Sequence, residues 1–288
     1  MLIMKYQEIL PPPALRPFVE NYWLITIDGA GSGRKEERSV PDGNTSLMFI
    51  SEQVSRIGPD GKEAAALSEQ AFVVGQKSKP VGYQFDNSRC LQAFGIRFRP
   101  AGLSYFTSIP QCELKDTILE AGQAFRHLVE ETQEQIVLAS DGVSKAELAN
   151  RFLWGNLLPK ETLRDQAERG ALLLLQCKGE TKIRSVSEQM GLHPRRLERL
   201  FNQYIGMSPK AFARVVRFNA AVHCHSKYPR RRLTELAHTA GYFDQMHFIK
   251  DFKAFTKQTP KAYFRQTGQN FHRYLARLLQ QRFDMAIA

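Results

Sequence analysis

The sequence predicts an α+β protein of more than one domain, with an N-terminal β-barrel or β-sandwich, helices after it, and a C-terminal all-α domain. Three observations carry this prediction. Short aromatic and β-branched runs alternate with Gly/Pro turns in the first 115 residues, helical periodicity fills most of the remainder, and one helical unit occurs twice. At 288 residues the chain can enclose two cores. We expect a β domain at 1–115, a helical section at 116–165, an all-α domain at 166–266 and an amphipathic helix at 267–288.

The β domain is predicted from runs that are rich in aromatic and β-branched residues. The expected strands are Phe18–Ile27, Leu47–Ile50, Ala71–Gly75, Val81–Phe85 and Leu91–Phe98. Short strands at close spacing with Gly/Pro turns are typical of a compact sandwich or barrel. No histidine precedes His127, which excludes histidine-dependent acid–base or metal chemistry inside this domain.

Three residues of the β domain are candidates for binding a small effector. Arg97 and Arg99 alternate with Phe98, so in a strand both arginines share the face opposite Phe98. Facing inward, they would bind an anionic or carbonyl ligand, with Trp23 as a further candidate. Facing outward, they would be surface charges or partners of Asp or Glu. We favour the second interpretation for the arginines, and a core role for Trp23, because arginine is rarely buried unpaired.

The pattern turns helical from Asp116 onward. Ala146 to Leu158 and Arg164 to Cys177 carry apolar residues at steps of three and four. The helices before Leu158 either pack on the β domain or pair with a second subunit, and the sequence leaves both open. The later helix is expected to belong to the all-α domain.

The all-α domain contains an internal repeat. Ile183 to Phe212 resembles Arg232 to Tyr263, and a shift of 51 residues places Leu197 on Phe248 and Phe201 on Phe252. Gly191 and Gly241 are only 50 apart, so the second copy has one extra residue, Phe243, in its turn. Each copy predicts two helices around a glycine turn, the helix-turn-helix unit that places a helix in a DNA groove.

Positive charge is concentrated on the half that holds the repeat. Residues 1–160 carry 17 Lys+Arg against 19 Asp+Glu, and residues 161–288 carry 23 against 10. The net charges are therefore −2 and +13, which indicates a nucleic-acid partner for the second half. One helix–glycine–helix segment alone would be weak evidence, whereas two copies in one basic domain favour DNA binding.

Helical spacing predicts which side chains of each second helix face the groove. In the first copy these are Arg195, Glu198, Arg199 and Asn202, and in the second Gln245, Met246, Ile249 and Lys250. Candidate phosphate contacts are Arg196, Arg230, Arg231 and Lys253. The run 230–232 is equally consistent with a solvated charge run.

The order of these motifs resembles the AraC/XylS family of bacterial transcription regulators. The matching stretches are Gly241 to Phe248, Thr259 to Phe264, His193 to Phe201 and Gly206 to Pro209. The resemblance implies two helix-turn-helix subdomains joined by a long helix, here about Pro209 to Ser226, with recognition helices in successive major grooves. It places base reading on Arg195, Glu198, Arg199, Gln245, Met246 and Lys250. This sequence departs from the family at Lys257, where glycine is usual, and at Met246, which replaces a small polar residue.

The N-terminal stretches PPPALRPFVENYW, RSVPDGN and FVVGQKSKPVGYQF are similar to a variant sensor barrel of such regulators. We therefore expect a cytoplasmic, sequence-specific DNA-binding transcription regulator that is not an enzyme and needs no cofactor or metal. The expected partners are double-stranded DNA, a small effector, a second subunit and, for an activator, RNA polymerase, with no membrane. A β domain that serves only in dimerisation is a further interpretation.

The alternative from another class is a DNA-repair or base-processing enzyme fused to the same DNA-binding module. Such an enzyme needs an activated or metal-bound cysteine thiolate. Cys90, Cys112, Cys177 and Cys224 form no CxxC pair, which disfavours this alternative, a disulfide framework and a zinc site.

The two copies of the repeat are predicted to differ in role. The first has Arg195 and Arg199 on its second helix, which are good hydrogen-bond donors to bases. The second has Met246 and Ile249 there. We expect the first unit to read sequence and the second mainly to anchor the protein.

Overall fold

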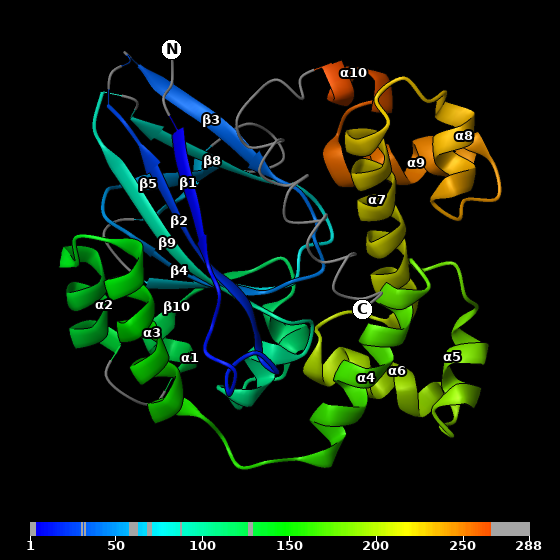
Figure 1. Ribbon diagram of the computed structural model, residues 1–288, viewed down its shortest axis with the longest axis horizontal. Coiled ribbons are helices and arrows are strands. Elements are labelled where there is room, and N and C mark those ends of the chain that lie inside the picture. Colours follow the sequence, from blue (N-terminus) through cyan, green and yellow to red (C-terminus); the bar gives the residue numbers. More distant parts are fainter. Residues whose placement is uncertain are drawn as a thin grey trace.

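A β-rich N-terminal part lies beside an all-helical C-terminal part (Figure 1). The computed structural model describes residues 4–29, 31, 33–57, 63–67, 71–86, 88–125 and 129–265. The amphipathic helix predicted at 267–288 falls outside the described residues. Within them, no helix has the length and hydropathy needed to cross a membrane.

Two antiparallel sheets form the β domain. The first has six strands in the order β1 (Met4–Ile9), β2 (Val19–Ile27), β9 (Leu91–Phe98), β4 (Ser46–Ile50), β7 (Ala71–Val74), β10 (Ile118–Glu120). The second has four, in the order β3 (Arg34–Ser39), β8 (Val81–Asp86), β5 (Val54–Ile57), β6 (Glu63–Leu67). The domain is therefore a sandwich of two open sheets. This confirms the predicted β-rich domain and shows that, of the two predicted architectures, it is a sandwich and not a closed barrel.

Alternation along the strands divides the apolar side chains between two cores. One face of the six-stranded sheet contributes Tyr22, Phe94 and Phe98 to the larger core, where all three are almost fully buried. The other face meets the four-stranded sheet through a smaller cluster that includes Ile50 and Phe85. The smaller cluster adjoins the cavity described below.

Three helices cover the outer face of the six-stranded sheet: α1 (Ala121–Ala124), α2 (Val129–Leu138) and α3 (Gly142–Asn156). Asn150 of α3 accepts a 2.5 Å hydrogen bond from the Tyr22 hydroxyl, which ties the helix to β2. The prediction of helix from Asp116 onward is wrong at its start. Ile118 to Glu120 pair with β7 as an edge strand, so the β domain extends past residue 115.

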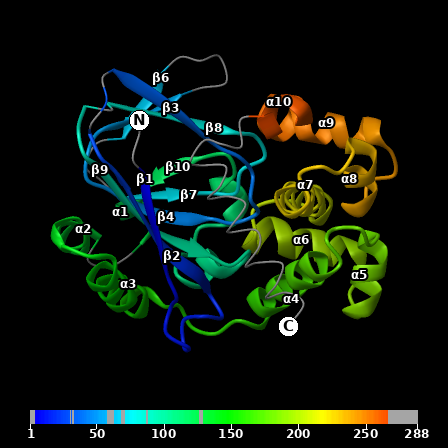
Figure 2. The same ribbon diagram turned by 45° about the horizontal axis from the view of Figure 1, so that its top comes forward.

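The C-terminal part consists of seven helices in the described residues: α4 (Thr162–Gln176), α5 (Ile183–Gln189), α6 (Pro194–Tyr204), α7 (Pro209–Lys227), α8 (Leu233–Thr239), α9 (Gln245–Thr256) and α10 (Pro260–Arg265). α5 with α6, and α8 with α9, are the two predicted helix-turn-helix units, and α7 is the predicted long helix between them. Figure 2 shows α4, α6 and α7 side by side. The fold class predicted from the sequence is confirmed.

The two units share their core and their turns. Phe201 packs on Phe212 in the first unit, and the equivalent residues, Phe252 and Tyr263, pack on each other in the second. The turn glycines, Gly191 and Gly241, have φ of 65° and 74°, a region that glycine occupies without strain. The helix that follows each unit is capped alike: the Ser208 side chain accepts from Ala211 N at the start of α7, and the Thr259 side chain accepts from Ala262 N at the start of α10.

Lys257 takes the left-handed conformation that glycine has in the first unit. Its φ is 60°, and Gly206, which lies 51 residues earlier, has a φ of 95°. Both residues follow the second helix of their unit, where a left-handed residue ends the helix. The departure at Lys257 thus leaves the turn intact, at the cost of about 1–2 kcal/mol of strain typical of a side chain in this region.

We expect Lys257→Gly to stabilise the protein by about 0.5–1 kcal/mol, because relieved strain exceeds the entropy that glycine adds to the unfolded chain. Urea unfolding of the full chain measures this change. Ala254→Gly is the matched control, since it puts glycine inside the same helix and should destabilise by about 1 kcal/mol. Equal destabilisation by both substitutions would contradict a strained Lys257.

Candidate nucleic-acid interface and its link to the N-terminal domain

The second helix of the first unit, α6, has one buried face and one charged face. Leu197, Leu200 and Phe201 are buried, as the helical spacing predicts. The residues on its opposite side are all exposed: Arg195, Arg196, Glu198 and Arg199. Arginine donors and a carboxylate acceptor on one face can pair with base edges in a major groove.

The corresponding helix of the second unit, α9, presents fewer hydrogen-bonding groups. Met246 is 76% exposed, and Lys250 and Lys253 are also exposed. Gln245 is half-buried, and its Oε1 accepts a 2.8 Å hydrogen bond from the Thr234 hydroxyl of α8. Bidentate recognition of adenine uses both the oxygen and the nitrogen of an amide, and this contact already occupies one of the two lone pairs of the Gln245 oxygen.

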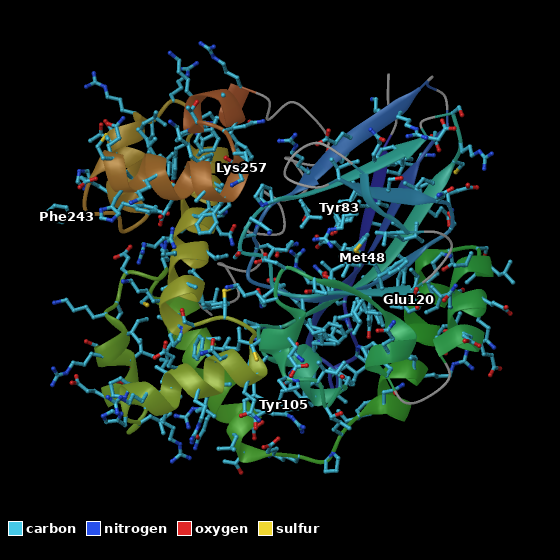
Figure 3. All side chains as sticks on the ribbon, turned by 180° about the vertical axis from the view of Figure 1, so that it is seen from behind. Met48, Tyr83, Tyr105, Glu120, Phe243 and Lys257 are labelled. Atoms are coloured by element: carbon cyan, nitrogen blue, oxygen red, sulfur yellow. The ribbon has the colours of Figure 1, made fainter. Side chains whose placement is uncertain are left out.

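Phe243 is an exposed residue that helical spacing does not place on the groove face, because it lies in the turn before α9. It is 89% exposed in the turn before α9, and Figure 3 shows it at the outer edge of the molecule, away from the β domain. The signal in the sequence was the one-residue excess of the second copy. With Met246, it places two large exposed apolar side chains around the start of α9.

The arginines of the 230–232 run differ in their surroundings. Arg231 lies over the Tyr228 ring at 4.1 Å and is 3.4 Å from the Thr239 hydroxyl, so it is held on the surface of the second unit. Arg230 is exposed. Both precede α8 in the chain, and exposed arginines of this kind can contact phosphates.

An ion pair fixes α9 on α7. Asp251 is buried and accepts from Arg214 at 2.7 Å from Nη2 and 3.2 Å from Nε. These hydrogen bonds raise the pKa of Arg214. Arg217 of α7 also lies over the Tyr242 ring, at 5.4 Å. The one buried carboxylate of α9 is therefore neutralised and does not weaken the positive potential of the exposed face.

A cavity of about 130 Å³ lies between the two sheets of the β domain. Apolar side chains from both sheets form most of its wall, among them Trp23, Met48 and Phe85. Figure 3 places Met48 and Tyr83 close together inside the domain. Glu37 also lines the cavity, and burial raises its pKa.

One end of the cavity is ionic. The Asp42 carboxylate is 3.2 Å from Lys77 Nζ and binds the Arg97 guanidinium through its other oxygen. Lys77 also donates to the Ser39 hydroxyl at 3.0 Å. The sequence did not single out Lys77 and Asp42. They follow separate strands, and polar residues are expected in the turns where they lie.

Of the three candidate effector residues, Trp23 and Arg97 line the cavity and Arg99 does not. The expectation that both arginines share one strand face is wrong, because β9 ends at Phe98. Arg99 instead donates to Glu168 of α4 at 3.2 Å. Both arginines pair with a carboxylate, Arg97 with Asp42 and Arg99 with Glu168. The favoured outward orientation is nevertheless wrong for Arg97, which is buried and lines the cavity.

Glu168 joins the β domain to the helical domain. Besides Arg99, it accepts a 2.8 Å hydrogen bond from the backbone N–H of Ala101. One turn earlier on α4, Asp165 accepts from the Tyr105 hydroxyl at 2.7 Å. Gly206 lies so close to Gln111 that an added Cβ would be 2.6 Å from the carbonyl oxygen of Gln111. The first helix-turn-helix unit therefore packs directly on the β domain.

In the described part of the chain, no three His, Cys, Asp or Glu side chains are placed to hold a metal. Cys90 and Cys112 are both exposed, the first beside β9 and the second in the short 3-10 helix Gln111–Leu114. The two cysteines thus stand on separate elements of the β domain.

Two families match this chain. Residues 186–266 match a family described as a helix-turn-helix domain, and residues 7–120 match a domain of unknown function, DUF6597. The first match covers α6 to α10, and the second covers the two sheets. Comparison with curated proteins gives no match.

Among solved structures, the chain is similar to ToxT from Vibrio cholerae. The likeness covers 91% of this chain and 97% of ToxT, at 10% identity and a TM-score of 0.48. A ToxT structure with bound unsaturated fatty acid is similar at 8% identity and a TM-score of 0.48, covering 91% and 94% of the two chains. The AraC-like transcriptional activator CuxR is similar over 70% of this chain and 74% of its own, at 10% identity and a TM-score of 0.30.

Glu168→Ala should destabilise the full chain by about 2–3 kcal/mol, because it leaves Arg99 unpaired and the buried Ala101 N–H without its acceptor. Thermal and urea unfolding measure this loss. Arg169→Ala, an exposed neighbour on the same helix, should change stability by no more than about 0.5 kcal/mol. If the two variants unfold alike, Glu168 does not hold the domains together.

Proposed function

We propose a function from the premise that the chain carries, at residues 186–266, a helix-turn-helix domain of the AraC type. The protein is a sequence-specific DNA-binding transcription regulator whose N-terminal domain responds to a small molecule. One observation carries this proposal. The helices α6 and α9 each have an exposed face with cationic side chains, and α7 links the two units to which they belong.

The first unit supplies most of the base recognition in this proposal. Arg195 and Arg199 can each donate two hydrogen bonds to guanine, and Glu198 can accept from the amino group of cytosine. Their exposure, and the buried stripe on the other side of α6, support this role.

In this proposal the second unit makes fewer base contacts than the first and mainly holds the protein on the DNA through phosphate contacts. Gln245 has its oxygen engaged with Thr234, and Met246 can only contact a thymine methyl group. Lys250 remains available for a base contact. Phosphate contacts come from Arg196, Arg230, Arg231 and Lys253, all of which are exposed.

The N-terminal domain is the proposed sensor, and its cavity the proposed effector site. The likeness to ToxT, a protein with a fatty-acid complex among its structures, agrees with a small-molecule effector but does not identify one. The exposed apolar residues Leu138, Val143 and Trp154 on α2 and α3 are available for pairing with a second subunit. RNA polymerase is a partner if the protein activates transcription.

Arg199→Ala should relax specificity at one base pair and weaken operator binding by about 1–3 kcal/mol. Gln245→Ala should cost less, because the Gln245 oxygen is already bonded within the protein. The operator is first selected from a random duplex pool with the full chain, and affinities are then measured on it and on its single-base variants. Arg89→Ala, an exposed arginine of the β domain, is the control. Equal losses from Arg199→Ala and Gln245→Ala would refute the unequal roles.

Lys253→Ala should weaken binding to operator and random DNA to the same degree, and should reduce the slope of log affinity against log salt by about 1. Fluorescence anisotropy over a range of salt concentrations gives the slope. Lys79→Ala removes an exposed lysine from the β domain and should leave the slope unchanged. A loss confined to the operator would mean that Lys253 contacts a base.

A further inference from the structure

The turn of the second helix-turn-helix unit is longer than that of the first by one residue. In both units the residue after the turn glycine donates its backbone N–H back to the first helix, over 2.8 Å from Leu192 and 3.0 Å from Tyr242. The N-cap residue of α6, His193, follows Leu192 directly, whereas Phe243 separates Tyr242 from the N-cap residue of α9. Phe243 is therefore the extra residue, and it lies outside the core pattern that the two units share.

The backbone at Phe243 is held on both sides, although its own side chain is 89% exposed. Before it, the buried ring of Tyr242 lies 5.3 Å from the Phe248 ring and 5.4 Å from the guanidinium of Arg217. After it, Asp244 caps α9 through a 2.7 Å hydrogen bond from the backbone. Burial of a phenylalanine stabilises a fold, and Phe243 contributes no such burial, so its ring remains available for contact with a partner.

The side chains that follow on α9 indicate the chemistry of that partner. Met246 is 76% exposed, and Lys250 and Lys253 follow it at steps of four and three, on the same face of the helix. Both lysines are exposed, and the carboxylate of Asp244 is occupied as the helix cap. Apolar groups followed by cations match a DNA major groove, where the thymine methyl is the apolar group of the base edges and phosphates border the groove.

Phe243 and Met246 lie at the end of α9 that such a unit inserts into the groove. In a helix-turn-helix, residues near the N-terminus of the recognition helix contact the base edges. Phe243 directly precedes the N-cap residue, and Met246 is the second residue of the helix. An aromatic ring can recognise thymine by apolar contact with its methyl group, without a hydrogen bond.

We propose that Phe243 is a specificity-determining residue that packs on a thymine methyl group in the major groove, with Met246 as a second apolar contact. The inference rests on the proposed function and deepens it, because it gives the second unit a base preference that needs no hydrogen bond. The ring would displace water from the methyl group at no loss. At cytosine it would instead take water from an amino group that it cannot replace as an acceptor.

Replacement of thymine by uracil removes the methyl group alone and tests the contact in the wild-type full chain. The operator is selected from random duplexes, and the base pairs whose specificity Arg199→Ala relaxes mark the half bound by the first unit. In the other half, uracil at one or two positions should weaken binding about fourfold, as expected for one buried methyl-sized group. Equal affinity for thymine and uracil throughout that half, or an operator with no thymine there, would overturn the proposal.

Two variants assign the preference to the residue. Phe243→Ala should bind the thymine and uracil operators equally, whereas Phe243→Leu keeps an apolar side chain and should keep most of the preference. Leu10→Ala removes a 66% exposed leucine of the β domain and should leave the preference unchanged. The readout is a ratio of two affinities of one protein, so a loss of stability does not alter it. A preference that persists in Phe243→Ala would assign the methyl contact to another residue and overturn the proposal.

The same measurements distinguish this inference from the proposed function. If no operator can be selected, the proposed regulator function fails, and the inference fails with it. If an operator is selected but its thymine and uracil forms bind alike, only the role of Phe243 fails. A protein partner is the competing occupant of this surface. Phe243→Ala that changes transcription with purified RNA polymerase, but neither DNA affinity nor the thymine preference, would assign Phe243 to that partner and overturn the proposal.

Discussion

The arrangement of the two domains depends on one buried carboxylate. Glu168 of α4 receives Arg99 and the backbone N–H of Ala101 from the segment after β9. A buried carboxylate is tolerated only when hydrogen bonds use its oxygens. The segment after β9 must therefore keep its position against α4 for both hydrogen bonds to Glu168 to persist. Because α6 and α7 both pack on α4, this contact also sets where the first recognition helix points relative to the β domain.

The same segment connects the cavity to that contact. Arg97 binds Asp42 at the ionic end of the cavity, Phe98 is fully buried in the larger core, and Arg99 binds Glu168. Three consecutive residues thus reach three different environments. The end of β9 thus contacts both the cavity and the α4 helix, with only Phe98 between the two arginines.

The helical domain was predictable because its signals are local and occur twice. Gly191 and Gly241 mark turns that need a positive φ, and Phe248 follows Leu197 at the repeat distance. The sheet was harder. Strand β3, RKEERS, has no apolar residue and lies at an edge, and Ile118 and Leu119 are compatible with a helix until β7 pairs with them. Periodicity alone cannot decide such short segments.

The ionic cluster of the cavity shows the same limit for sites. Asp42 and Lys77 are 35 residues apart, and only the folding of the sandwich brings them together. The exposed face of α6 was predictable from helical spacing, whereas the packing of the first unit on the β domain was not. The first unit packs on the β domain through α4 and Gly206, whereas the second is joined to the first by α7 and by Arg214 on Asp251. A change in the β domain therefore reaches the first unit directly, and that unit carries Arg195 and Arg199. The unit proposed to supply most of the base recognition is therefore also the one that packs on the β domain.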